Sequence, residues 1–247
     1  MIVGQTNAVQ LTQVIVSNKP DYEYQYNEVN LVSAEKSKYI FILHRYNDKN
    51  QLVANDYYGD FGLLSSDSLA VQNALNRKEW VSTANSSFGG TLSYEYNLNG
   101  QLLNSIFSRP LTDNQERSEF SYDISNRIAR QTIYWESKVT GYIDYLYDAK
   151  GNLVKEILYS VTTSGVAEPS TTTQYEFDSY QNPYQSFSRL MIPGINTNPN
   201  NIIKETYTIH FKPGQGTDIV QTTVFTYTYN SLGYPIKMNA TVEFIYI

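Results

Sequence analysis

A short unit that begins at Tyr145 recurs along the chain and limits what the chain can fold into. Its two tyrosines, Tyr145 and Tyr147, stand two residues apart and therefore share one face of a β-strand. Asp148 suits the first position of a type I turn, because its carboxylate can accept hydrogen bonds from the turn backbone. Gly151 suits the left-handed position that closes such a turn. Leu153 then restarts an apolar alternation, so the unit predicts one β-hairpin.

Six further copies of this unit lie between residues 24 and 235. Each has an aromatic residue or histidine, one spacer, a second aromatic residue and then Asn or Asp. In all but the copy that begins at Tyr175, a Gly or Asn follows three residues later, and these two residues tolerate the left-handed conformation best. The six copies begin at Tyr24, His44, Tyr94, Phe120, Tyr175 and Tyr227. An internal repeat of hairpins is therefore the main architectural signal.

The turn chemistry also predicts the register of each hairpin. A type I turn closed by a bulge places the second aromatic residue across from the residue six positions later. The expected pairs are Tyr96 with Leu102, Tyr147 with Leu153, and Tyr229 with Pro235. Such cross-strand pairs contribute roughly 0.2–1 kcal/mol each, so the abundance of tyrosine is mainly a structural signature.

Composition excludes several classes of protein. The chain of 247 residues has a net charge of −6 and no Lys/Arg cluster, which argues against a nucleic-acid partner. It contains no cysteine, so disulfides, thiolate nucleophiles and cysteine-based metal sites are ruled out. No apolar run approaches the ~20 residues of a transmembrane helix. No phosphate, dinucleotide or calcium-binding motif is present, so we expect no cofactor and no metal.

The remaining stretches are less regular. Asp67 suits a helix N-cap, and residues 68–76 are predicted to form one short helix. Residues 57–62 are predicted to be a loop, 85–90 a turn-rich connector, and 160–174 and 186–201 long loops. The strand-like stretch 205–211 is interpreted as a degenerate repeat in the gap before the last unit. No break in composition marks a linker, so we expect a single domain over residues 1–247.

The predicted fold is all-β, a long antiparallel meander of repeated hairpins with about 14–18 strands. We expect these to form a large curled or barrel-like sheet with the short helix at 68–76. A two-sheet sandwich and a propeller with four strands per blade of ~50 residues are the alternatives.

The unit Tyr-x-Tyr-Asp-x-x-Gly-Asn-Leu at Tyr145–Leu153 resembles the YD repeat of Rhs-type proteins, and the copy at Tyr94–Leu102 is the next nearest. As a whole the chain is similar to YD-repeat-like surface lipoproteins of Bacteroidetes. The resemblance implies a secreted or cell-surface protein, associated with a bacterial outer membrane or periplasmic, with a glycan or a surface protein as partner. The repeat spacing here is longer than in Rhs proteins, and no lipobox cysteine is present, so a lipid anchor would lie outside this chain.

No catalytic constellation is recognisable. His210 alternates with polar residues and is expected on a solvated face, while His44 replaces the first aromatic residue of a repeat and is expected to pack like one. The aspartates of the repeats are explained by their turn position. Asp56 and Asp60 share a stretch with two tyrosines and are the carboxylates that a glycan-acting hydrolase would need.

The sequence leaves three functions open. We expect a non-enzymatic ligand-binding module or scaffold; a glycan-acting hydrolase and an outer-membrane barrel are the alternatives. Aromatic residues outside the first two positions of the repeat are the candidates for ligand contact, because exposed aromatic faces serve as platforms for sugars. They are Trp80, Trp135, Tyr57, Tyr58 and Tyr184.

Overall fold

The computed structural model describes residues 9–59, 82, 86–110, 115–187, 192–212 and 214–247. Within these ranges the chain forms one antiparallel sheet of 17 strands, and the helices are two short 3-10 turns. The strands are β1 (Leu11–Val16), β2 (Lys19–Tyr26), β3 (Val32–Ser37), β4 (Ile40–Tyr46), β5 (Leu52–Gly59), β6 (Ser87–Tyr96), β7 (Leu102–Ser108), β8 (Gln115–Tyr122), β9 (Ile128–Trp135), β10 (Lys138–Tyr147), β11 (Leu153–Val161), β12 (Ala167–Gln181), β13 (Asn200–Ile209), β14 (Ile219–Val224), β15 (Tyr227–Tyr229), β16 (Pro235–Met238) and β17 (Val242–Tyr246). The predicted all-β meander is confirmed.

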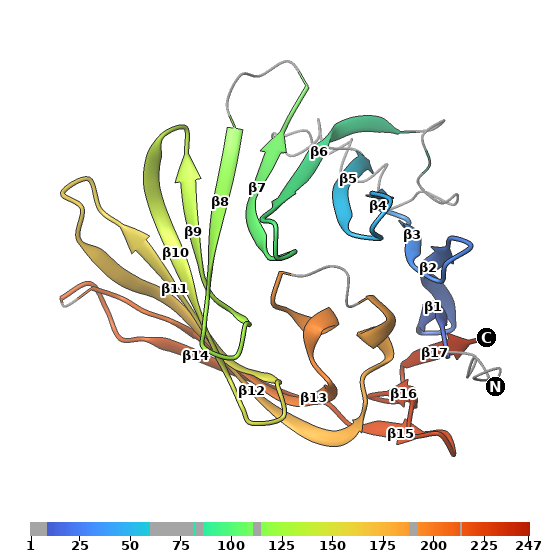
Figure 1. Cartoon of the computed structure of the whole chain (residues 1–247). Helices are drawn as coiled ribbons and strands as arrows, with labels where there is room; N and C mark the ends of the chain where they lie inside the picture. The colour runs from blue at the N-terminus through green and yellow to red at the C-terminus, as the bar shows by residue number, and fades with distance from the viewer. Residues whose placement is uncertain (1–8, 60–81, 83–85, 111–114, 188–191, 213) are drawn as a thin grey trace.

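Each strand pairs with the next one along the chain from β1 to β14, and β15, β16 and β17 pair in the same way. β17 returns to pair with β1, so the two ends of the described chain lie on neighbouring strands. The ladder is interrupted between β14 and β15, where the chain runs directly from one strand to the other through Phe225 and Thr226. The sheet therefore curls strongly but does not close (Figure 1).

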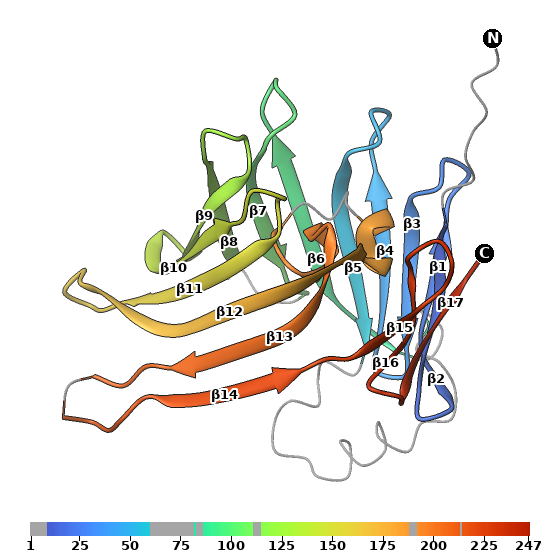
Figure 2. The same cartoon turned by 90° about the horizontal axis from the view of Figure 1, so that it is seen from below.

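The curled sheet surrounds two stretches, 182–187 and 192–199, which carry the 3-10 helices η2 (Pro183–Phe187) and η3 (Ile195–Thr197) (Figures 1 and 2). We call these two stretches the inserted segment. Phe187 is 2% exposed and packs edge-on against Tyr24, with 4.6 Å between ring centroids. Further along, Ile192 packs on a second cluster that includes Leu102 and Leu153. We call the side of the sheet that meets this segment the inner face.

The predicted turns and register are confirmed at six of the seven units. In each of these the Asn or Asp side chain accepts backbone N–H bonds from residues two and four positions later. The left-handed position is occupied as predicted, with φ of 62° at Asn126 and 94° at Gly151. The expected pairs Tyr96–Leu102, Tyr147–Leu153 and Tyr229–Pro235 all form.

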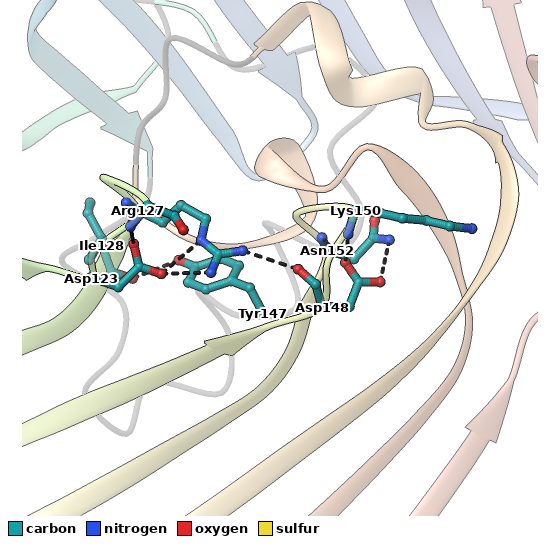
Figure 3. Close-up of polar contacts among 8 residues, drawn as sticks. Asp123, Arg127, Ile128, Tyr147, Asp148, Lys150 and Asn152 are labelled. Atoms are coloured by element: carbon teal, nitrogen blue, oxygen red, sulfur yellow. Dashed lines mark hydrogen bonds and ion pairs between the residues drawn. The ribbon is translucent and has the colours of Figure 1, made fainter.

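Successive hairpins are joined by a tyrosine hydroxyl that was not expected from the sequence. In each case a tyrosine donates to a main-chain carbonyl oxygen on an adjoining hairpin, over 2.6–3.0 Å. Figure 3 shows the region of one such contact, from Tyr147 to Ile128. The donors are Tyr26, Tyr46, Tyr96, Tyr122, Tyr147, Tyr227 and Tyr246. We call these contacts tyrosine clasps.

Three loop predictions were wrong. Tyr57, Tyr58 and Gly59 belong to β5, and residues 87–90 open β6, because pairing between these two strands continues the ladder across both stretches. Residues 160–174 are mostly strand, with β11 and β12 joined by a tight turn at 162–166. In that turn Thr162 takes the place of Asn or Asp, and its hydroxyl accepts the N–H of Val166.

The unit that begins at Tyr175 does not form the predicted hairpin. Phe177 pairs with Ile202 on β13 rather than with a residue six positions later, and β12 runs on to Gln181. The residue that should close its turn is Gln181, which tolerates the left-handed conformation poorly. Of the predicted strand-like stretch 205–211, residues 205–209 lie in β13, which ends at Ile209. The helix predicted at 68–76 lies outside the described residues, and no described helix is long and apolar enough to cross a membrane.

Candidate functional site

A cavity of about 400 Å³ lies on the inner face, between the sheet and the inserted segment. Strands β4 to β9 supply its floor, and Ile192 of the inserted segment closes one side. The described residues that line it are Ile40, Tyr57, Leu92, Ser105, Phe107, Glu116, Ser118, Gln131 and Ile192. The volume falls within the range typical of small-molecule sites, and the lining mixes aromatic and aliphatic side chains with a few polar ones.

Two aromatic rings form one wall of the cavity. Tyr57 and Phe107 meet edge-to-face, with centroids 5.8 Å apart and planes at 82°. Their approach depends on Gly90, which lies opposite Tyr57 on β6 and adopts a φ of 145°. A Cβ at Gly90 would come within 2.5 Å of the Ser108 carbonyl oxygen and 3.0 Å of the Phe107 ring. Glycine is therefore required for this pair of rings to form.

The opposite part of the cavity is polar and held in one arrangement by hydrogen bonds. Ser105 and Ser118 pair directly across β7 and β8, and both are buried. The Gln131 amide donates to the Ser118 hydroxyl over 2.9 Å, and its oxygen accepts from the Tyr145 hydroxyl over 2.8 Å. Because these bonds fix the orientation of the Gln131 amide, its remaining N–H is directed rather than free to rotate.

One charged pair stands at the mouth of the cavity. Glu116 is exposed, lies opposite Phe107, and accepts a hydrogen bond from Arg109 over 3.0 Å. The Arg109 guanidinium also lies 5.3 Å from the centre of the Phe107 ring. Since both charges are largely solvated, their pairing contributes little stability, and either group can turn to a ligand.

A second polar cluster lies on the inner face next to the cavity. His44 is buried and bridges Glu35 and Asn55, with contacts of 3.0 Å at Nε2 and 2.7 Å at Nδ1. Asn55 in turn donates to the Tyr94 hydroxyl over 2.9 Å, and burial raises the pKa of Tyr94 well above its usual value. His44 is buried as predicted, but it is held by polar partners rather than packed as an aromatic substitute. His210 is partly exposed, between Thr172 and Asp218.

The five predicted ligand-contact residues do not form one site. Tyr57 lines the cavity, and Trp135, 43% exposed, lies opposite Glu116 at its edge. Tyr58 points to the other face of the sheet, between Phe41 and Phe88. Tyr184 lies in η2 and packs in the core against Tyr24, Phe187 and Phe244, while Trp80 lies outside the described residues.

Of the described lining residues, the sequence predicted only Tyr57. Those missed on β7 to β9 are Ser105, Phe107, Glu116, Ser118 and Gln131. These residues share only their place in the strand pairing: the register from β6 to β9, which the hairpin turns set, brings them to one face of the sheet. No motif distinguishes them from other strand residues. To find them from the sequence, one would need the pairing of all these strands and the side of the sheet to which each residue points.

The described lining of the cavity does not contain a pair of carboxylates. Of the described lining residues, Glu116 alone carries a carboxylate. Asp56 faces away from the cavity and bonds Arg45 and Thr91, and Asp60 lies outside the described residues. In the described ranges, no group of three or more His, Asp or Glu side chains is placed to hold a metal ion.

No protein-family model and no curated protein matches the chain. Solved structures do resemble it. A porin-like protein from Bacteroides uniformis aligns over 96% of this chain and 96% of its own, with 11% identity and a TM-score of 0.44. A porin-like protein from Bacteroides vulgatus covers 96% and 98%, with 8% identity and a TM-score of 0.42. The TcdB2-TccC3 structure aligns over 84% of this chain and 10% of its own, with 11% identity and a TM-score of 0.33.

Proposed function

We propose that the protein is a non-enzymatic binding module that holds a glycan segment in the inner-face cavity. The observation that carries the proposal is the pairing of an aromatic wall, Tyr57 and Phe107, with the fixed amide of Gln131 in one cavity of about 400 Å³. A sugar ring has an apolar C–H face that packs on an aromatic ring, and hydroxyl groups that bond amides and serine hydroxyls. The two halves of the cavity match those two surfaces.

The proposed setting is the cell surface or a secreted form, associated with an outer membrane or in the periplasm. The support is the resemblance of the hairpin unit at Tyr145–Leu153 to the YD repeat, together with the six hairpins that form as that unit predicts. Should no glycan bind, the same hairpin sheet would act as a scaffold or as a docking platform for a surface protein.

The test is a thermal-shift and calorimetric titration with a panel of soluble oligosaccharides that differ in monosaccharide composition. A ligand present at 100 times its Kd stabilises the folded state by about 2.7 kcal/mol, which gives a clear shift of Tm. Affinity is then compared between Tyr57→Ala and Tyr58→Ala. These neighbours each lose an aromatic contact, but only Tyr57 lines the cavity.

We expect Tyr57→Ala to weaken binding at least about tenfold, or about 1.4 kcal/mol, while Tyr58→Ala keeps the wild-type Kd. A sugar that binds both variants equally would place its site elsewhere and contradict the assignment of the cavity. If no member of the panel shifts the Tm, the glycan-binding proposal fails and the scaffold alternative takes its place.

A further inference from the structure

β14 has one edge that no strand covers in the part of the chain that the structure describes. Its other edge pairs with β13 over the whole strand, without a register shift. The N–H of Phe225 donates to the Ile203 carbonyl oxygen over 2.8 Å. Every second residue before Phe225, namely Thr223, Gln221 and Ile219, therefore directs its backbone N–H and C=O groups to β13. Because these positions alternate along an antiparallel ladder, Val220, Thr222 and Val224 point their N–H and C=O groups to the open edge.

The open stretch has a defined end. Thr226 accepts the N–H of Asn239 over 2.9 Å, and neighbouring residues of an extended chain point their backbone groups to opposite edges. β16 therefore lies on the same edge as the open stretch and covers it only from Thr226 onward. Figure 2 shows β14 running along the outside of the sheet before the chain reaches β15 and β16.

The side chains of β14 favour association. Val220 and Val224 are each 61% exposed and Ile219 is 54% exposed. No charged residue occurs between Ile219 and Tyr229. Proteins usually protect a strand edge with Lys, Pro, a bulge or a covering segment, and the described structure has none of these at β14.

We propose that β14 pairs antiparallel with β14 of a second copy of this chain, about a two-fold axis through Thr222. In this register Val220 faces Val224 of the second copy, and the two Thr222 residues face each other. All three outward positions of each strand then meet, giving about six hydrogen bonds between the copies. Val–Val and Thr–Thr pairs are favourable across strands, and no like charges are brought together.

The register also fits the surroundings. In this register Ile219, the first residue of β14, faces Phe225 of the second copy. β16 of that copy covers the edge only from Thr226 onward, so the two paired strands do not overlap with it. A self-complementary sequence is what an isologous two-fold interface requires, which favours a second copy over an unrelated strand. The dimer would extend the sheet of each copy across the edge and leave the inner-face cavity of each copy in place.

The first test is the molecular mass of the intact chain in solution as a function of concentration, by sedimentation or light scattering. We expect the wild type to shift from monomer to dimer. Thr222→Pro removes the central outward N–H and is tolerated at an open edge, so it should stay monomeric with an almost unchanged Tm. Thr222→Val keeps the N–H and should dimerise like the wild type. A monomeric wild type at every concentration, or a Thr222→Pro variant that dimerises normally, would overturn the proposal.

A second test addresses the register. In Val220→Lys/Val224→Lys, two pairs of like charges would face each other, and dimerisation should weaken at least about tenfold. In Val220→Lys/Val224→Glu, each Lys would face a Glu of the other copy, and dimerisation should return. If both double variants dimerise equally, β14 does not pair in this register and the inference is wrong.

Discussion

The hydroxyl of Tyr147 donates a hydrogen bond to the main-chain carbonyl oxygen of Ile128 over 2.7 Å (Figure 3). Ile128 is itself the residue that faces Tyr122 across the preceding turn, and Tyr122 makes the same contact to Leu102. The clasps of Tyr46, Tyr96, Tyr122 and Tyr147 share this relation. Each ties the turn end of one hairpin to the residue that faces the second aromatic residue of the hairpin before it. The guanidinium of Arg127, 4.6 Å from the centre of the Tyr147 ring, also bonds the Asp148 carbonyl oxygen and covers the contact.

Tyr147→Phe tests the contribution of one clasp. The ring still fills its place, but the Ile128 carbonyl oxygen loses its donor, so we expect the free energy of unfolding to fall by about 1 kcal/mol. Chemical denaturation measures the change. The control is Tyr39→Phe, on a half-exposed tyrosine whose hydroxyl has no partner in the described residues, and it should stay within about 0.5 kcal/mol of wild type. Equal effects of the two variants would show that the clasp adds nothing.

The turn position at Gly151 gives a second prediction. Its φ of 94° is strained for alanine, while a Cβ at this position would meet nothing closer than the Pro199 ring at 3.8 Å, so the cost is conformational rather than steric. We expect Gly151→Ala to destabilise by about 1 kcal/mol. Gly151→Asn should cost less, because Asn30 and Asn126 hold the equivalent position with φ near 60°. Denaturation midpoints compare the two variants, and an alanine that outperforms asparagine would contradict this reasoning.

Hairpin architecture was predictable because its determinants are local. A turn of fixed chemistry sets the register over six residues, so the pair Tyr147–Leu153 follows from the sequence around Asp148 alone. The cavity was not predictable, because Phe107 and Gln131 meet Tyr57 only after several ladders have been added and curled together. The length of β5 was also not predictable from the local sequence. The stretch that begins at Tyr57 is typical of a loop, and it forms a strand because β6 pairs with it.

The unit that begins at Tyr175 shows that the local repeat pattern does not predict contacts between distant parts of the chain. Phe177 has no hydroxyl, so it cannot donate a clasp to Leu153, the residue that faces Tyr147 in the hairpin before it. The Leu153 N–H donates to the side-chain oxygen of Asn198 in the inserted segment over 2.8 Å, and Asn152 exchanges hydrogen bonds with Asn200. The asparagine-rich stretch looked irregular in the sequence because its partners are about 45 residues away in the chain.

Asp123→Asn should change how stability depends on pH. The Arg127 main-chain N–H is the largest cause that holds the pKa of Asp123 below its ordinary value, and the Arg127 side chain adds to it. A lowered folded-state pKa stabilises the fold above the ordinary value near 3.8, and this contribution is lost as the pH falls below it. Asparagine fits the turn, as Asn97 shows, but it cannot ionise.

We therefore expect the wild type to exceed Asp123→Asn in stability at neutral pH, with the difference shrinking as the pH falls to about 3. Denaturation curves at a series of pH values measure it. A difference that stays constant over this range would show that ionisation of Asp123 does not contribute.

The clasps should also make the fold sensitive to alkali. Burial, with a smaller effect from neighbouring Tyr122, raises the pKa of Tyr96 to about 12. A tyrosine with a raised folded-state pKa supports the fold fully below its ordinary value of 10, and this contribution is lost as the pH rises from there through about 12. Stability should therefore fall as the pH rises above 10, since the ionised ring can no longer donate to the Leu52 carbonyl oxygen. Tyr96→Phe should be less stable than wild type at pH 8 but should lose less between pH 8 and pH 11. Parallel declines in the two proteins, measured by chemical denaturation, would assign the alkaline loss to other groups.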